Sequence, residues 1–415
     1  MKRYGLIGER LGHSYSKTLH GLLQTYAYEL LPMPPQELDA FMTARAFDGI
    51  NVTIPYKQAV IPYCAELSAC ARRIGSVNTV VKRADGSLYG DNTDAYGFAM
   101  LARGAGMDFH GVKALVLGSG GTSLTACDVV RRAGGEAVVI SRNGENRYEE
   151  LERHADAAFL INATPVGMYP NTDAAAVDLV RLPNLRGVLD VIYNPLRTRL
   201  LQQAEALGIP CACGLSMLAW QAARACEQFT GTPVPPERVR GALRELRKAA
   251  MNLVLVGMPG CGKSTVGAEA ARLMDLPLVD LDAEIEREAG MDIPSIFAKW
   301  GEGGFRTLEA ALVERFGREG GRVLVTGGGA VSTAANREHL RLNGFVIHLT
   351  RDISLLPMAG RPLSQSREAL ERLWRERAPL YAACADGTIE NQNTPAACAR
   401  AVVEAYHEAL CNQWP

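Results

Sequence analysis

The chain has 415 residues, which is enough for two or three domains at about 150 residues per domain. Hydrophobic residues make up 47% and charged residues 21%, an ordinary globular composition that excludes a disordered or collagen-like protein. The chain has 44 basic and 45 acidic residues. Up to residue 250 there are 27 basic and 24 acidic residues, and after it there are 17 basic and 21 acidic residues. Neither part has the basic excess that a nucleic-acid partner requires, so we expect none.

Residues 1–100 begin the chain with short strand-like runs that alternate with helical ones. The first run, at Tyr4–Leu6, is not preceded by a signal-peptide core, and no apolar run approaches the roughly 18 residues of a membrane span. We therefore expect a cytoplasmic protein with no membrane partner. The 10 cysteines and 7 histidines are scattered, which predicts neither a disulfide scaffold nor a zinc site.

Polar side chains occur in this first part where a simple core would be apolar. Each of them alone is more often a turn or helix-cap residue. Converging hydroxyls, amides, one lysine and one carboxylate would instead suit a polyhydroxylated substrate. The residues concerned are Ser14, Ser16, Thr53, Lys57, Asn78 and Asp94.

Residues 111–210 repeat strand, glycine turn and helix in quick succession. We expect a strand at Lys113–Leu117, a turn at Gly118–Gly121, a helix at Ser123–Ala133 and a strand at Ala137–Ser141. This βαβ order predicts a parallel, Rossmann-like sheet with a pyrophosphate at the helix N-terminus. Ser123 stands where the strict pattern has a third glycine, and a purely structural turn is the alternative.

The end of the next strand indicates which dinucleotide binds. Its residues, Val139–Asn143, include Arg142 and no acidic residue. A carboxylate there would bind the adenosine 2′-hydroxyl, whereas an arginine suits a 2′-phosphate, so NADP is favoured over NAD. The alternative is that Arg142 is a solvated surface residue.

Eight motifs occur in order along the first part of the chain: Ser-x-Ser-x-x-x-His (14–20), Asn-Val-Thr-x-Pro-x-Lys (51–57), Val-Asn-Thr (77–79), Gly-Asp-Asn-Thr-Asp (90–94), Gly-x-Gly-Gly (118–121), Asn-Ala-Thr-Pro-x-Gly-Met (162–168), Asp-Val-x-Tyr-x-Pro (190–195) and Gly-Leu-x-Met-Leu-x-x-Gln (214–221). Together they resemble the shikimate dehydrogenase family, from residue 4 to residue 247. The resemblance implies that Lys57 and Asp94 form the catalytic pair. Lys17, where the family usually has proline, and Ser141–Asn143, in place of Asn-Arg-Thr, depart from its pattern.

The resemblance also implies two sets of binding residues. Those around shikimate would be Ser14, Ser16, Thr53, Asn78, Asp94, Tyr193 and Gln221, and those lining the cofactor would be Gly118, Gly120, Gly121, Arg142, Thr164, Met168 and Gly214.

A boundary follows near residue 249. A helix is expected at Arg238–Lys248, and a buried strand starts at Met251. That strand ends in Gly-x-x-Gly-x-Gly-Lys-Ser-Thr (257–265), the strand–GxxxxGK[ST]–helix pattern of a phosphate loop. Backbone N–H groups of such a loop surround a phosphate, the lysine neutralises the β/γ-phosphates and the serine binds Mg²⁺. The residues concerned are Gly260, Gly262, Lys263, Ser264 and Thr265.

Carboxylates and an arginine accompany this loop. Asp280 and Asp282 end the strand expected at Leu278–Leu281, where alternation would put both on one side, for Mg²⁺ and a substrate hydroxyl. A helix cap is the alternative for Asp282. Arg306 and Glu309 are spaced i, i+3, so that the carboxylate can hold the guanidinium. Three glycines at 327–329 would let a ligand approach the backbone.

Four further motifs follow the phosphate loop: Asp-x-Asp-x-x-Ile-Glu (280–286), Gly-Glu-x-x-Phe-Arg-x-x-Glu (301–309), Arg-Pro-Leu (361–363) and Arg-Ala-Pro-Leu-Tyr (377–381). Together with the loop, they make residues 251–411 resemble shikimate kinase. The resemblance implies a fold like that of nucleoside-monophosphate kinases. Arg306 and Arg377 would bind the shikimate carboxylate, and Asp282 would accept the hydroxyl proton. The Gly327–Gly329 backbone, including Gly328, would lie under the ring, Asp280 would reach Mg²⁺ through water, and Arg361 would belong to the ATP lid. The segment before Arg361 is shorter than the family's lid, and Pro357 and Ser364 depart from its pattern.

The sequence thus predicts an α/β protein with two activities. Residues 1–100, completed by helices from 215–248, would bind substrate, 101–214 would bind NADP(H), and 251–415 would be a P-loop kinase domain with a parallel sheet using ATP and Mg²⁺. The first half would reduce 3-dehydroshikimate and the second would phosphorylate shikimate. Alternatives are a dehydrogenase half that also uses quinate, and a nucleotide-binding regulator without turnover. A homo-oligomer and direct transfer of shikimate between the sites stay open.

Overall fold

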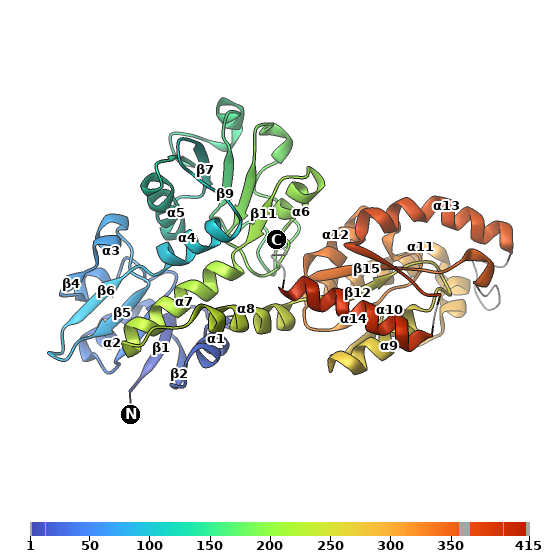
Figure 1. Ribbon diagram of the computed structural model, residues 1–415, viewed down its shortest axis with the longest axis horizontal. Coiled ribbons are helices and arrows are strands. Elements are labelled where there is room, and N and C mark those ends of the chain that lie inside the picture. Colours follow the sequence, from blue (N-terminus) through green and yellow to red (C-terminus); the bar gives the residue numbers. More distant parts are fainter. Residues whose placement is uncertain (1, 13, 357–365, 393, 412–415) are drawn as a thin grey trace.

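The computed structural model describes residues 2–12, 14–356, 366–392 and 394–411, and these form three sheets in succession along the chain (Figure 1). The expected α/β class with parallel sheets is confirmed. Within the described ranges, no helix is long and apolar enough to cross a membrane.

The first sheet is mixed and has the strand order β2-β1-β3-β5-β6-β4. β1 is buried along its whole length, and it pairs in parallel with β2 and β3. β5 runs antiparallel to β3 and β6. The elements are β1 (Tyr4–Gly8), α1 (Ser16–Leu23), β2 (Tyr28–Pro32), α2 (Leu38–Ala44), β3 (Gly49–Val52), β4 (Glu66–Leu67), α3 (Ala69–Ile74), β5 (Thr79–Lys82) and β6 (Leu88–Asp91).

The second sheet is wholly parallel, in the order β11-β10-β9-β7-β8. Its central strands are apolar runs buried on both faces, as helix-covered parallel sheets require. The helix after the glycine turn begins at Gly121, two residues before the predicted start. The elements are β7 (Lys113–Leu117), α5 (Gly121–Arg132), β8 (Glu136–Ile140), β9 (Phe159–Asn162), β10 (Gly187–Asp190), α6 (Arg199–Ala206) and β11 (Cys211–Cys213).

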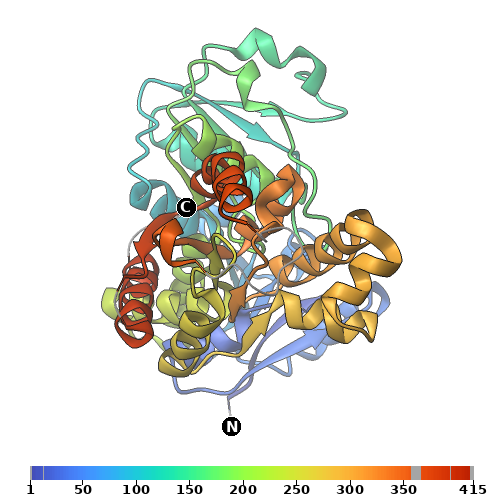
Figure 2. The same cartoon turned by 90° about the vertical axis from the view of Figure 1, so that its right-hand side faces the viewer.

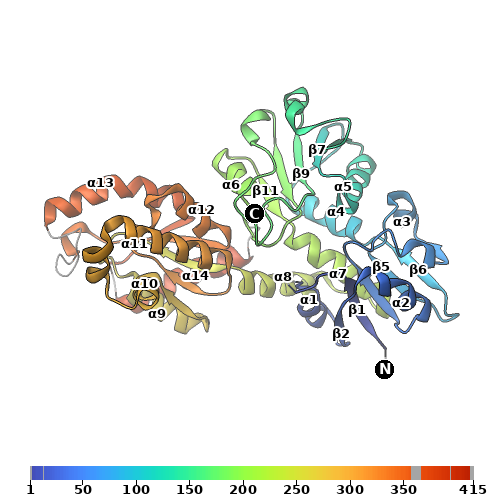
Figure 3. The same cartoon turned by 180° about the vertical axis from the view of Figure 1, so that it is seen from behind.

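Helix α4 (Asp94–Gly104) leads from the first sheet to the second, and α7 (Leu215–Thr230) returns the chain to the first (Figure 3). α8 (Pro236–Ala250) then leads to the third sheet. α7 packs against α4 and α1. At its end the ring of Phe229 stacks on Tyr4 of β1, with ring centroids 5.1 Å apart. The space between the two sheets is therefore bounded on one side by α7.

The third sheet is also wholly parallel, in the order β13-β14-β12-β15-β16. Seen from the end that this sheet occupies, its orange and red helices lie in front of the rest of the chain (Figure 2). The elements are β12 (Asn252–Val256), α9 (Lys263–Met274), β13 (Leu278–Asp280), α10 (Leu281–Ala289), α11 (Ile293–Arg318), β14 (Val323–Val325), α12 (Ala334–Leu342), β15 (Gly344–Thr350), α13 (Arg367–Cys384), β16 (Gly387–Glu390) and α14 (Pro395–Cys411), with short 3-10 turns at Pro35–Glu37, Ile61–Tyr63, Tyr148–His154, Leu179–Arg181, Ala330–Ser332 and Ile353–Leu355.

One expected strand ends earlier than its pattern suggested. β13 stops at Asp280, whose side chain accepts a hydrogen bond from the backbone N–H of Asp282 and so caps α10. Asp282 therefore lies in the first turn of a helix and not on a strand. The prediction that strand alternation aligns the two carboxylates was wrong, because the helix cap takes precedence over the period-2 pattern.

Candidate active sites

The first and second sheets enclose a cavity of about 490 Å³. It opens at the carboxyl ends of β7, β9 and β10, where parallel α/β sheets bind ligands. Eleven of the residues singled out in the sequence line it, and they come from segments up to about two hundred residues apart. They are Ser14, Ser16, Thr53, Lys57, Asn78, Asp94, Thr164, Met168, Tyr193, Gly214 and Gln221.

Lys57 and Asp94 form an ion pair inside this cavity. The Lys57 Nζ donates to Asp94 Oδ2 at 2.5 Å, and the side chains are only 17% and 11% exposed. Asp94 is the first residue of α4, where the helix dipole stabilises a carboxylate. The backbone of Lys57 is held as well, because its carbonyl accepts from Val77 N at 2.8 Å. The pair can hold and transfer a proton at one defined point.

A buried hydrogen-bond network lies beneath the pair. Asn78 Nδ2 donates to Thr93 Oγ1 at 3.0 Å and to Gln221 Oε1 at 3.4 Å, while Thr93 N donates to Asn78 Oδ1 at 2.7 Å. On the opposite wall, Ser14 Oγ donates to Ser16 Oγ at 3.0 Å. These bonds fix polar groups that a hydroxylated ligand would meet.

The glycine turn lies beside the cavity and does not line it. Gly118 has a φ of +101°, and a Cβ there would lie 3.0 Å from Thr164 Cγ2, so only glycine fits. The Ser123 hydroxyl donates to the Gly118 carbonyl at 2.6 Å, which holds the turn where the strict pattern has a third glycine. Gly120 caps α5 and Gly121 begins it. This backbone fits a pyrophosphate at a helix N-terminus.

Arg142 is exposed and follows β8 at the same sheet edge. Gly118 N donates to the Ile140 carbonyl at 2.8 Å, so the arginine lies two residues beyond a strand that is bonded to the glycine turn. A guanidinium at this place suits the 2′-phosphate of NADP.

The third sheet has its own cavity, of about 590 Å³, at the carboxyl ends of β12 and β14. Asp280 lies beside it, accepting from Ser264 Oγ at 2.8 Å. Arg361 lies outside the described residues. The lining includes Gly260, Gly262, Lys263, Ser264, Thr265, Asp282, Arg306, Gly327, Gly328, Gly329 and Arg377.

The lysine of the phosphate loop is hydrogen-bonded to the backbone of the same loop. Lys263 is buried, and its Nζ donates to the carbonyls of Gly257 and Met258 at 2.9 and 3.0 Å. An ammonium group has three hydrogens, and these carbonyls are the acceptors found in the described part of the chain, so one hydrogen remains for a phosphate oxygen. Gly262 has a φ of +102°, and a Cβ there would collide with Asn391.

Charged groups are paired across the floor of this cavity. Arg306 Nη1 donates to Glu309 Oε2 at 2.6 Å, and Glu309 is only 1% exposed. A Cβ at Gly327 would lie 2.7 Å from Asp282 Oδ1, and one at Gly329 would collide with the Arg306 guanidinium. Both glycines are therefore needed for these side chains to reach the cavity.

The pKa of Asp282 is raised. Burial is the main cause, and the charge of Asp280 adds to it. Burial also raises the pKa of Glu309, although Arg306 opposes this shift. A carboxylate with a raised pKa binds a proton more readily, as a group that accepts one from a hydroxyl must.

Some lining residues were not predicted from the sequence. Arg351 directly follows β15, so the rule that ligands bind at the carboxyl ends of strands could have identified it. Tyr381 lies in a quoted motif and does not line the cavity, but its hydroxyl donates to the Gly328 carbonyl at 2.5 Å, which fixes the glycine run. In the first cavity, Met217 lies in a quoted motif but was given no role, and Tyr169 gave no distinct signal, because a single aromatic residue in a loop is common.

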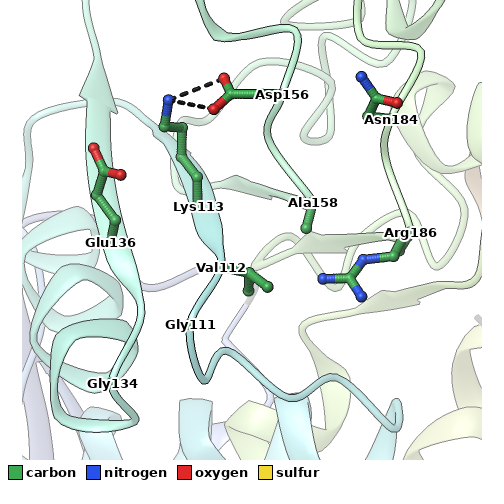
Figure 4. Close-up of a pocket in the computed structure, with 9 residues that line it drawn as sticks. All are labelled: Gly111, Val112, Lys113, Gly134, Glu136, Asp156, Ala158, Asn184 and Arg186. Atoms are coloured by element: carbon green, nitrogen blue, oxygen red, sulfur yellow. Dashed lines mark hydrogen bonds and ion pairs between the residues drawn. The ribbon is translucent and has the colours of Figure 1, made fainter.

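A further hollow lies at the opposite edge of the second sheet, at the amino ends of its strands (Figure 4). Lys113 Nζ pairs there with Asp156 at 2.7 Å, and the Arg186 guanidinium lies over the Phe159 ring. Because ligands of parallel sheets bind at the carboxyl edge, we do not assign this hollow a catalytic role. Among the described residues, no group of three or more His, Cys, Asp or Glu could hold a metal ion, and the cysteines are free thiols.

Comparison with known proteins identifies both parts. The model of the shikimate dehydrogenase substrate binding domain matches residues 6–80, that of the shikimate 5′-dehydrogenase C-terminal domain matches 214–244, and that of shikimate kinase matches 259–408. The shikimate dehydrogenase (NADP(+)) of Methanopyrus kandleri is 36% identical over 276 residues, covering 58% of this chain and 94% of that protein. The chain belongs to the shikimate dehydrogenase family. Its second half is a shikimate kinase domain, so the predicted fusion is confirmed.

Two solved structures extend the comparison of the dehydrogenase half. The shikimate 5-dehydrogenase of Thermus thermophilus, in complex with NADP(H) and shikimate, is 33% identical with a TM-score of 0.55, covering 59% of this chain and 99% of that one. The quinate dehydrogenase of Corynebacterium glutamicum, in complex with NAD, is 28% identical with a TM-score of 0.53, covering 59% and 98%. The predicted NADP and ATP cofactors are confirmed, and Mg²⁺ is typical of kinases.

Proposed function

We propose that this shikimate dehydrogenase–kinase reduces 3-dehydroshikimate to shikimate with NADPH and then phosphorylates shikimate to shikimate 3-phosphate with MgATP. The observation that carries this proposal is the pair of separate polar cavities. Each contains the charged groups that its reaction requires, and each lies in a part of the chain that matches the corresponding family.

For the first reaction we assign proton transfer to Lys57, held by Asp94. NADPH supplies the hydride to the ketone carbon when it is bound. The Lys57 Nζ then gives a proton to the ketone oxygen, and Asp94 keeps the ammonium in position. We assign the ring hydroxyls and carboxylate of the substrate to Ser14, Ser16, Thr53, Asn78, Tyr193 and Gln221.

For the second reaction we assign the substrate carboxylate to Arg306 and Arg377, and the proton of the attacking hydroxyl to Asp282. Positioning and charge neutralisation supply most of the catalysis in phosphoryl transfer, which agrees with a site made of paired charges. Lys263 and the loop backbone would hold phosphates, while Ser264 and Asp280 would hold Mg²⁺, the latter through water. ATP supplies the phosphoryl group when it is bound.

A one-pot assay tests both reactions. With 3-dehydroshikimate, NADPH and MgATP, the full chain should produce shikimate 3-phosphate. Lys57→Ala should abolish NADPH oxidation and leave phosphorylation of added shikimate, and Lys263→Ala should do the reverse. Binding of both nucleotides without turnover in either assay would contradict the proposal and favour a nucleotide-binding regulator.

Quinate is a second candidate substrate for the dehydrogenase half, because a quinate dehydrogenase is among its structural relatives. The serine pair at 14 and 16 favours shikimate. Comparing kcat/KM for the two acids, each with NADP and with NAD, decides between them.

Domain limits and finer statements about partners are part of the proposal. We propose a substrate domain at 1–100 completed by 215–248, a cofactor domain at 101–214 and a kinase domain at 251–415. We propose that the partners of the protein are small molecules, with neither nucleic acid nor membrane involved, and that it is located in the cytoplasm. Light scattering tests whether copies associate.

A further inference from the structure

Two loops of the dehydrogenase cavity continue directly into contacts with the kinase domain. The cofactor loop (residues 164–174) follows β9, and the tyrosine loop (residues 191–198) follows β10. Both line the cavity, with Thr164 and Met168 on the first and Tyr193 on the second. They are also bonded to each other, because Tyr169 N donates to the Asn194 carbonyl at 3.0 Å.

The tyrosine loop is bound by its backbone to the amino edge of the kinase sheet. Leu196 N donates to Asn343 Oδ1 at 2.9 Å, and Arg197 N donates to the Leu342 carbonyl at 2.8 Å. Leu342 and Asn343 immediately precede β15. These bonds begin three residues after Tyr193, so they restrict how far the tyrosine can move.

The side chain of Arg197 reinforces this contact. It is 2% exposed, and its Nη2 pairs with Asp386 of the kinase domain at 2.5 Å while its Nε pairs with Glu205 of α6 at 2.9 Å. Asp386 immediately precedes β16 and also accepts from Val346 N at 2.8 Å. A buried cation needs such partners, because leaving it uncompensated is strongly unfavourable.

The cofactor loop is held by a second group of kinase side chains. Arg318, at the end of α11, donates through Nε to Thr172 Oγ1 at 3.0 Å and through Nη2 to Asp173 Oδ2 at 2.8 Å. His339 Nε2 is 2.9 Å from Asp173 Oδ1. Thr172 and Asp173 lie four and five residues after Met168, so the loop is held close to its cavity-lining part.

These contacts lie far from the phosphate loop. The bonded residues precede β14, β15 and β16, whereas the kinase cavity is at the carboxyl ends of the strands. β15 has 7 residues, which at about 3.3 Å per residue separates its two ends by about 20 Å. A change at the amino edge can therefore alter the dehydrogenase loops without touching the kinase site.

We propose that the kinase domain is a structural part of the dehydrogenase site, with Arg197 and Asp173 as positioning residues. Through them, Asp386 and Arg318 of the kinase hold the tyrosine loop and the cofactor loop in their binding positions. The inference rests on the proposed dehydrogenase function, and it assigns the kinase domain a second role that is independent of phosphorylation.

The first test replaces Asp386 by asparagine in the full chain. The amide oxygen can still accept from Val346 N, whereas the amide NH2 replaces the oxygen that accepts from Arg197 Nη2, so the change removes both the charge opposite Arg197 and that hydrogen bond. We expect KM for 3-dehydroshikimate to rise between about five- and a hundredfold, because small displacements of binding groups are costly, with a smaller change in kcat. Kinase kcat/KM should stay within about twofold, as for distant independent sites.

The matched control is Glu338→Gln. Glu338 is also an acid of the kinase domain and pairs with an arginine of the dehydrogenase half, but its partner Arg199 lies on α6. The Nη2 of Arg199 is also 3.8 Å from Asp173 Oδ1 of the cofactor loop, and Glu338→Gln leaves that contact in place. This variant should keep the parent KM values for both dehydrogenase ligands.

The second test is Arg318→Gln, which releases the cofactor loop. We expect it to raise KM for NADPH more than KM for 3-dehydroshikimate, and to weaken NADPH binding measured by fluorescence titration. If Asp386→Asn loses both activities through misfolding, Arg318→Gln decides alone, since this side chain is 20% exposed.

Parent-like KM values and NADPH affinity in both variants, or equal effects in Glu338→Gln, would overturn the inference. A parent chain that binds NADPH but does not reduce 3-dehydroshikimate would instead overturn the proposed function, and the NADPH titration of Arg318→Gln would still test the loop contact.

Discussion

At the scale of single residues, Asp190 shows how the dehydrogenase cavity depends on a buried group that does not line it. Its Oδ1 accepts from Asn162 Nδ2 and from Ile192 N, both at 3.0 Å, and its Oδ2 accepts from Thr198 Oγ1 at 2.7 Å. Asn162 in turn accepts from the backbone and hydroxyl of Thr164. The carboxyl group thus links the starts of the cofactor loop and the tyrosine loop.

Burial raises the pKa of Asp190 from its ordinary 3.8 to about 7, although its three hydrogen bonds oppose the shift. Between about pH 4 and pH 7 the unfolded chain loses this proton and the folded chain keeps it, so the group's contribution to stability is lost as the pH rises. Asparagine does not titrate; its oxygen can accept from Asn162 Nδ2 and Ile192 N, and its amide nitrogen can donate to Thr198 Oγ1 in place of the third bond. As the pH rises across this window, the free energy of unfolding of Asp190→Asn should therefore increase relative to that of the parent, by on the order of 4 kcal/mol. Urea denaturation at several pH values measures this, and a difference that does not vary with pH would contradict it.

Single residues also show what the sequence could predict. Lys57, Asp94, Lys263 and Arg306 were found because their chemistry and motif spacing are distinctive. Asp190 was quoted in a motif without a role, because only burial distinguishes it from an ordinary carboxylate at a strand end. Arg197 and Arg318 gave no signal, since an arginine reads as a surface residue until its partner, more than a hundred residues away, is known.

At the scale of elements, the close packing of α4 against α7 determines one wall of the dehydrogenase cavity. α4 carries Asp94, and α7 carries Met217 and Gln221, which also line the cavity. Gly97 allows the two helices to approach, because a Cβ there would lie 2.9 Å from Gln221 Cβ and closer still to the Met217 carbonyl oxygen.

Gly97→Ala should therefore push α7 outward. We expect a loss of about 1–3 kcal/mol of stability, as for other overpacked interiors, together with weaker binding of 3-dehydroshikimate. Gly21→Ala is the matched control, because this helical glycine in α1 has no atom within 4 Å of the added methyl group. Thermal unfolding and steady-state kinetics measure both effects, and equal behaviour of the two variants would rule out the packing argument.

Elements differed in how well their patterns predicted them. Glycine turns followed by helices were located to within two residues, since the turn chemistry and the helical periodicity agree there. The end of β13 was missed because polar and apolar residues alternate from Asp280 to Asp282, and only the Asp280 side chain, bonded to Asp282 N, ends the strand. A side-chain hydrogen bond that caps a helix thus competes with a strand-like sequence pattern, and the local backbone geometry determines which one forms.

At the scale of the whole molecule, the kinase domain lies beside the dehydrogenase half (Figures 1 and 3). It contacts that half through the amino edge of its sheet, whereas its cavity lies at the carboxyl ends of the strands. The sequence could not predict this arrangement, because the contacts come from loop and helix ends scattered over both halves. We therefore expect shikimate made in the first cavity to leave it and pass through solvent to reach the second.

This arrangement predicts free exchange of the intermediate. When the full chain converts unlabelled 3-dehydroshikimate in the presence of labelled shikimate, the shikimate 3-phosphate formed should carry the label at the fraction present in solution throughout the reaction. Mass spectrometry of samples taken over time measures this fraction. Product that is less labelled than the pool would mean direct transfer between the sites.

The join between the halves is a single residue. α8 ends at Ala250, β12 begins at Asn252, and Met251 between them is 1% exposed, with its carbonyl accepting from the Tyr406 hydroxyl at 3.0 Å. Proteases cut where a chain is exposed and can be drawn out, and this junction offers neither condition. The two domains therefore stay joined one to one at this point of the chain, and cleavage here cannot change the amount of one site without the other.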